Sequence, residues 1–91
     1  MSLSSSEKKA LKARAHHLKP VVRIGQKGVT DTVVEETAQC LERHELIKVH
    51  VQEGERDERM ACARELASAT GAELVHYIGK VFVLFRPRMT A

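Results

Sequence analysis

KPVVRIGQKGVTD, residues 19–31, is the stretch that decides the fold, because a short apolar run passes through two glycines into residues that start helices. The β-branched run from Val21 to Ile24 predicts a strand with Arg23 on the face opposite Val22 and Ile24. A glycine pair between a strand and a helix has three interpretations: a plain turn, a nucleotide-phosphate loop, or a clamp for a nucleic-acid backbone.

Upstream of this stretch the sequence predicts a basic helix. Ser4 and Glu7 match a capping box, so we expect the helix to begin there. Leu11, Ala15 and Leu18 recur at helical spacing and form its expected buried stripe. Pro20 disfavours helical geometry at the residue before it, so we expect it to end the helix.

Downstream, the pattern alternates between helix and strand. Residues 30–32 supply helix-starting side chains for a helix to about residue 44, and the alternation in residues 46–52 predicts a strand with Ile47, Val49 and Val51 inward. A third helix is expected from about residue 57 to a glycine cap at Gly71. Its expected buried residues are Met60, Ala63, Ala67 and Leu66, as those of the second helix are Val34, Ala38 and Leu41.

Two further strands, residues 73–78 and 81–86, flank Gly79 and Lys80 and predict a tight hairpin. The expected order is αβαβαββ, which predicts an α/β two-layer sandwich. Its mixed four-stranded sheet would carry the helices on one face. Ninety-one residues with 43% apolar content favour a single domain over residues 1–91.

Composition narrows the class of protein. Apolar runs are too short to cross a bilayer, the N-terminus lacks a secretory pattern, and Cys40 and Cys62 lack metal-binding spacing, so we expect a cytoplasmic protein. Residues 1–28 carry a net charge of +6, residues 29–59 carry −5, and residues 60–91 carry +2. This polarity favours an anionic partner on one side of the molecule.

The glycine pair has the chemistry of a phosphate site. Glycines allow close approach of a ligand, and the helix that follows offers free amides. Lys27 at the tip adds an ammonium group, and Thr30 adds a hydroxyl. Residues 25–31 lack the spacing of a triphosphate loop, whereas a G-x-x-G after a strand, with Lys19 and Arg23 upstream, is typical of modules that clamp backbone nucleotides.

Three blocks, LKARAHHLKPVVRIGQKGVTDTV, HELIKVHV and TGAELVHYIGKVFVLFRP, together resemble the CRM domain (chloroplast RNA splicing and ribosome maturation). The resemblance runs from about Ser4 to Pro87 and is strongest to the stand-alone bacterial YhbY family. It implies a KH-like fold, similar to the C-terminal domain of initiation factor three. It also implies RNA contact through the G-x-x-G loop and association with precursors of the large ribosomal subunit.

The resemblance assigns RNA contacts to two sets of residues. The loop is Gly25, Gln26, Lys27 and Gly28, and the basic approach to it is Lys12, Lys19 and Arg23. Thr30 joins them through its hydroxyl. We expect a non-enzymatic protein without metal or cofactor, because the five histidines form no zinc pattern and no nucleophile accompanies the carboxylates.

Aromatic stacking on RNA is a weaker expectation than backbone contact. The aromatic residues are Tyr77, Phe82 and Phe85, all in the expected hairpin; Phe85 fits the core, and the other two are undecided. A second hypothesis from another class is a protein-interaction module, whose acidic middle would dock a basic ribosomal protein. Its residues would be Glu35, Glu36, Glu42, Glu45, Glu53, Glu55 and Glu58.

Overall fold

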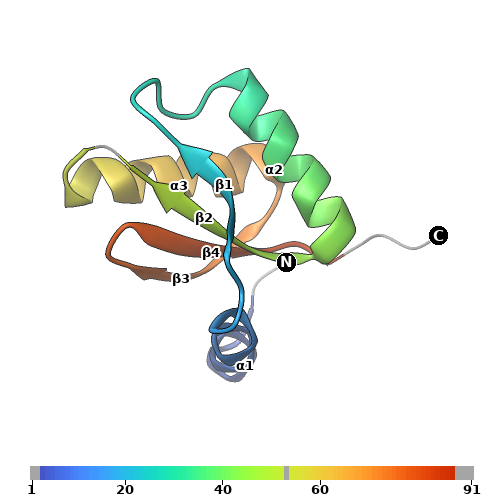
Figure 1. Cartoon of the computed structure of the whole chain (residues 1–91). Helices are drawn as coiled ribbons and strands as arrows, with labels where there is room; N and C mark the ends of the chain where they lie inside the picture. The colour runs from blue at the N-terminus through green and yellow to red at the C-terminus, as the bar shows by residue number, and fades with distance from the viewer. Residues whose placement is uncertain (1–2, 53, 88–91) are drawn as a thin grey trace.

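The computed structural model describes residues 3–52 and 54–87, and its elements follow the predicted order αβαβαββ (Figure 1). They are α1 (Ser5–Ala15), β1 (Pro20–Ile24), α2 (Asp31–His44), β2 (Leu46–Val51), α3 (Arg56–Thr70), β3 (Glu73–Ile78) and β4 (Val81–Phe85).

The four strands form one mixed sheet in the order β1-β2-β4-β3. β1 runs parallel to β2, while β4 runs antiparallel to both β2 and β3. Gly79, with φ 58°, turns the chain between β3 and β4, so the predicted hairpin is confirmed. The prediction of a mixed four-stranded sheet is also confirmed.

The main core lies between the sheet and helices α2 and α3. Alternate side chains of each strand point into it: Val22 and Ile24 from β1, Ile47, Val49 and Val51 from β2, and Phe82 and Leu84 from β4. The helices contribute Leu41, Ala63, Leu66 and Ala67. The buried face predicted for β2 is therefore confirmed.

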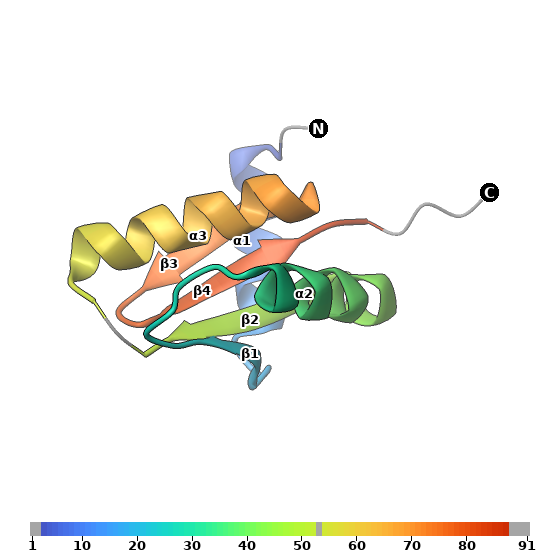
Figure 2. The ribbon, with the colours of Figure 1, turned by 90° about the horizontal axis from the view of Figure 1, so that it is seen from above.

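The prediction that all helices cover one face of the sheet is wrong. Helix α1 packs on the opposite face, through a second cluster that joins Leu11 and Ala15 to Leu46, Val75 and Val83 (Figures 1 and 2). The physical reason is that β2, β3 and β4 each carry an apolar residue on this second face as well. An apolar area of that kind is stabilised by a covering helix.

Helix α1 begins as predicted but ends early. Ser4 and Glu7 form the capping box, with the Glu7 amide donating to Ser4 Oγ at 3.1 Å and the Ser4 amide donating to Glu7 Oε1 at 3.0 Å. The helix stops at Ala15, well before Pro20, which already belongs to β1. Leu18 therefore lies in the connection and is 37% exposed, so its expected place in the buried stripe is wrong.

The other helix ends follow the sequence signals. Thr30 caps α2, and Gly71, with φ 69°, ends α3 in the left-handed conformation. Thr37 and Thr70 are buried although neither was expected, because each hydroxyl donates to a carbonyl of its own helix: to Val33 O at 2.7 Å and to Leu66 O at 2.8 Å. Their polar groups are thereby satisfied inside the core.

The Arg86 side chain ties the C-terminal ends of α2 and α3 together. Its guanidinium donates to Thr70 O at 2.7 Å and Ala38 O at 3.2 Å, and it pairs with Glu42 at 3.3 Å. Its bond to Thr70 O satisfies an acceptor that the end of α3 leaves without an amide. Arg86 is thus used for the fold.

Candidate nucleic-acid interface

The GQKG segment forms an exposed turn between β1 and α2. The Gly28 amide donates to Gly25 O at 3.0 Å, and Gly28 has φ +73°, a conformation that favours glycine. The two residues between the glycines, Gln26 and Lys27, are exposed at the tip. The turn thus leaves the Lys27 side chain exposed to solvent.

Gly25 differs from Gly28 in one respect that bears on function. It is not among the glycines with positive φ, and a Cβ built on it would meet nothing within 4 Å. The fold itself therefore does not require glycine at position 25. A ligand that approaches the backbone closely would require it.

Helix α2 starts immediately after the turn and adds polar groups to it. Thr30 Oγ1 accepts from the Val33 amide at 3.2 Å and keeps its own hydroxyl hydrogen for another acceptor. The first turn of this 14-residue helix also offers amides and a partial positive charge. The exposed carboxylate of Asp31 lies in the same turn and offsets part of that attraction.

A surface hollow of about 290 Å³ adjoins the turn. One wall is the GQKG segment, and the other comes from Val51, Gly54, Glu58 and Cys62. Glu58 is held by the α3 capping box, where its Oε1 accepts from the Glu55 amide at 3.2 Å. Burial raises the pKa of the Cys62 thiol, with help from Glu65 and Glu58, so the thiol stays protonated at neutral pH.

The predicted basic residues occupy three places rather than one. Arg23 is exposed on β1 and points to the α1 face of the sheet, because its neighbours Val22 and Ile24 point into the core. Lys12 lies on α1, and Lys19 lies in the connection before β1. Strand β1 leads from the latter two towards the GQKG segment (Figure 1). None of the three makes an ion pair with a described residue.

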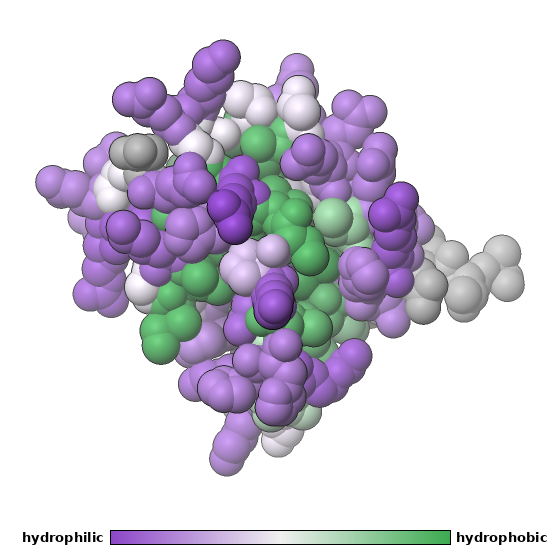
Figure 3. All heavy atoms as spheres, viewed as in Figure 1, coloured by the Kyte–Doolittle hydropathy of each residue, from purple (hydrophilic) through white to green (hydrophobic). Residues whose placement is uncertain are grey.

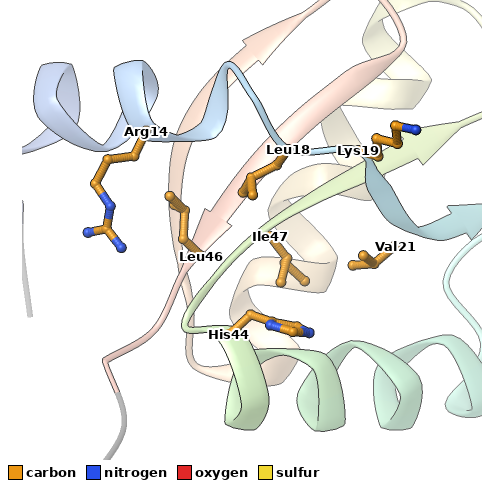
Figure 4. A pocket seen from close by; sticks show the side chains of 7 residues that line it. All are labelled: Arg14, Leu18, Lys19, Val21, His44, Leu46 and Ile47. Atoms are coloured by element: carbon orange, nitrogen blue, oxygen red, sulfur yellow. The ribbon is translucent and has the colours of Figure 1, made fainter.

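A second hollow, of about 340 Å³, lies where β1 begins (Figure 4). Leu18, Leu46 and Ile47 line it, and Val21, which is 49% exposed, lines the side next to β1. The cationic or titratable residues that line it are Arg14, Lys19 and His44. Figure 3 shows the corresponding apolar area on this face, ringed by hydrophilic side chains.

Sequence reasoning did not identify Arg14 and His44 as members of this hollow. They come from the ends of α1 and α2, which meet the start of β1 only in the folded chain. Their spacing in the sequence, 30 positions apart, carries no signal of that proximity.

The acidic residues of the middle segment mostly have local structural roles. Glu55 and Glu58 cap α3, and Glu42 pairs with Arg86. Glu45 ends α2 with φ 62°, while Glu35 and Glu36 are exposed on α2. Glu53 lies outside the described residues. Of the described members of this set, Glu35 and Glu36 are the ones that take no part in these caps or this ion pair, so a docking surface for a basic protein would be centred on α2.

Two features are absent from the part of the chain that the structure describes. Within residues 3–52 and 54–87, no group of three or more His, Cys, Asp or Glu side chains could hold a metal ion. Over the same residues, no helix has the length and apolar character to cross a membrane.

Comparison with known proteins assigns the chain to a family. Residues 3–86 match the model of the CRS1/YhbY (CRM) domain. "Probable RNA-binding protein PA4753" of Pseudomonas aeruginosa is 41% identical over 86 residues, which cover 94% of this chain and 83% of the relative. "Probable RNA-binding protein YqeI" of Bacillus subtilis is 34% identical over 84 residues, which cover 92% of this chain and 88% of the relative.

The fold has a solved counterpart in Staphylococcus aureus. The solution structure of the protein SAV1595 superposes with a TM-score of 0.86 at 34% identity, covering 98% of this chain and 93% of that one. The sequence and fold comparisons thus agree with one another. The chain belongs to the CRS1/YhbY (CRM) domain family.

Proposed function

We propose that this protein binds RNA by its sugar-phosphate backbone, through the GQKG turn, the start of α2 and the cations along β1. The observation that supports this most directly is Gly25. Its glycine has no role inside the protein, yet it lies beside an exposed lysine and a capped helix start. The names of the relatives, which describe RNA-binding proteins, point to the same ligand.

The mode of binding follows from the side chains available. Phe82 is fully buried in the core, and Phe85 and Tyr77 are partly buried against the two apolar clusters, so stacking on a base is less favoured than backbone contact. Cations and backbone amides remain as the contacts, and these recognise phosphate rather than base identity. We therefore propose a non-enzymatic RNA-binding protein. The resemblance to the YhbY family supports a role in assembly of the large ribosomal subunit.

Removing the Lys27 ammonium group tests its proposed ionic contact with an RNA phosphate. Lys27→Ala is expected to flatten the slope of log affinity against log salt by about 0.7, the value for one phosphate contact to a single strand. The measurement is fluorescence anisotropy with labelled RNA between about 50 and 200 mM salt. Arg64→Ala removes one exposed charge from α3 and should leave the slope unchanged. Equal slopes for the two variants would exclude Lys27 as a contact.

Gly25→Ala separates RNA contact from folding. The added methyl group meets no protein atom, so the free energy of unfolding should stay the same or rise by up to about 1 kcal/mol. RNA affinity should nevertheless fall by roughly fivefold, because the methyl group occupies the space into which the backbone of the ligand fits. Chemical denaturation and anisotropy measure the two quantities on the same sample. Unchanged affinity would show that no ligand approaches this position closely.

The ribosomal role has its own experiment. Extracts of cells that produce the tagged protein are separated by sedimentation, and bound RNA is mapped by cross-linking. Cross-links to large-subunit RNA in particles lighter than the mature subunit are expected. Recovery of a ribosomal protein without RNA would favour the protein-docking hypothesis instead.

A further inference from the structure

Helix α1 and the sheet face beneath it enclose a groove of about 310 Å³. Its apolar lining comes from Ala15, Pro20, Ile78, Val81 and Val83. Its remaining lining residues are all basic, namely Lys12, His16, Lys48 and His76, and no acidic residue lines it. We call this the α1 groove. It is a different surface from the GQKG turn.

Sheet register explains how basic side chains from distant parts of the chain meet in the α1 groove. Lys48 of β2 pairs with Val83 of β4, which pairs in turn with His76 of β3. The two basic side chains are therefore separated by one strand, which places their backbones roughly 10 Å apart. A long lysine side chain and an imidazole can both reach a phosphate group held over Val83.

A β-bulge brings His76 into this groove. The register of β3 against β4 shifts between Leu74 and His76. Leu74 packs into the main core, whereas Val75 packs under α1 and His76 lines the groove. Strict alternation would have placed His76 on the same face as Leu74. The extra residue turns it to the α1 face instead.

Charge in the α1 groove is not neutralised by the protein. Lys12 and Lys48 make no ion pair with a described residue, although Lys48 is half-buried. Burial lowers the pKa of His76, and the positive charge of Lys12 lowers it further. Both effects disfavour protonation of His76. A bound anion would counteract the effect of the Lys12 charge.

Further basic residues lie between the α1 groove and the GQKG turn. In the next row of the same sheet face, Arg23 of β1 pairs with His50 of β2. Strand β1 starts at Pro20 in the groove and ends one residue before Gly25. Five residues of strand span roughly 16 Å, so one extended RNA segment can contact both places.

We propose that the α1 groove is a second RNA site, which binds a phosphate of a single-stranded segment between Lys12, Lys48 and His76. This inference rests on the proposed RNA-binding function. The basic side chains of the groove favour an anionic ligand. The apolar residues around them suit the ribose and the nucleobase that flank a phosphate in RNA. A protein segment with an acidic side chain is the competing occupant that the test excludes.

Phosphate in the groove couples binding to protonation. At about pH 7.5 His76 is neutral in the free protein, and a bound phosphate raises its pKa, so binding takes up a proton. RNA affinity should then rise as the pH falls towards about 6, by at most about tenfold per pH unit for one proton. The groups facing His76 are Lys12 and His16 from α1 and Lys48 from β2; His50 lies one row further along β2.

The test uses the full chain and an oligouridine of about twelve nucleotides. The pKa of His76 is read from its imidazole resonances by NMR, in the free protein and at saturation with the oligouridine. We expect the pKa to rise by about one unit on binding. In His76→Gln the pH dependence of affinity should be reduced to that of the other histidines, and in Lys48→Gln affinity should fall by roughly fivefold. His17→Gln, outside the groove lining, should behave as the unchanged protein.

Each outcome has a distinct meaning. An unchanged His76 pKa in the complex, or a full pH dependence in His76→Gln, would overturn the second site even if Lys27→Ala flattens the salt slope. A raised His76 pKa without any effect of Lys27→Ala would keep the groove and remove the turn as a contact. If the oligouridine does not bind and an acidic peptide raises the His76 pKa, both RNA sites are refuted.

Discussion

Reversing the charges of Arg23 and Lys27 together, by Arg23→Glu and Lys27→Glu, is expected to weaken RNA binding by roughly 100-fold. A hydrogen bond to a charged group contributes about 1.5 to 3 kcal/mol, and the lower end of that range for two exposed contacts, about 3 kcal/mol, corresponds to a factor of roughly 100. Both side chains are exposed and make no ion pair with a described residue, so the fold should be unaffected. Anisotropy at about 0.1 M salt measures the loss, and circular dichroism verifies the fold.

A matched control separates local contact from total charge. Arg43→Glu with Arg64→Glu changes two exposed cations on α2 and α3, and it lowers the formal net charge from +3 to −1, as the first pair of changes does. These helices lie on the sheet face opposite α1. We expect less than a threefold change in the RNA affinity of the control. At about 0.1 M salt, charges more than roughly 10 Å from the RNA are largely screened. Equal losses in the two variants would mean that RNA responds only to overall charge.

The order of elements could be predicted from the sequence because its signals are local. Capping residues marked the starts of α1 and α2, Gly71 marked the end of α3, and Gly79 marked the hairpin. Alternation in β2 gave the buried face directly. These signals depend on neighbouring residues and on backbone geometry, which a sequence displays without reference to the rest of the chain.

The position of α1 could not be predicted in the same way. Its stripe shows that it buries Leu11 and Ala15, but not against which face. That choice depends on Leu46, Val75 and Val83, which lie on three strands and meet only when the sheet has formed. Leu46 is apolar next to apolar Ile47, and Val75 belongs to a bulge, so neither fits a simple apolar–polar alternation in the sequence.

The same distinction divides the candidate site. The GQKG turn and Thr30 are contiguous, so sequence analysis could propose them as one unit. The α1 groove requires Lys12, Lys48 and His76 from three elements, one of them turned by a bulge. Long-range register, rather than composition, creates that site. Sequence reasoning grouped Lys12 with the turn, whereas the structure places it in the groove.

Phe82→Ala is expected to have the largest effect on stability, because Phe82 is fully buried, with 0% exposure, in the central strand β4. Replacing a buried phenylalanine by alanine costs about 3 to 5 kcal/mol, as lost burial and an unfilled cavity. A domain of this size has a total stability of about 5 to 14 kcal/mol. The variant should therefore unfold at much lower urea concentration, measured by circular dichroism.

Phe85→Ala is the matched comparison, since Phe85 lies on the same strand but is only half-buried under α1. Its cost should be about half that of Phe82→Ala, because less apolar area leaves water on folding. The ordering also bears on RNA recognition, because a phenylalanine that fills the core cannot stack on a base. If Phe82→Ala cost less than Phe85→Ala but weakened RNA binding of the folded protein, Phe82 would be a stacking residue. Recognition of RNA without base stacking would then be refuted.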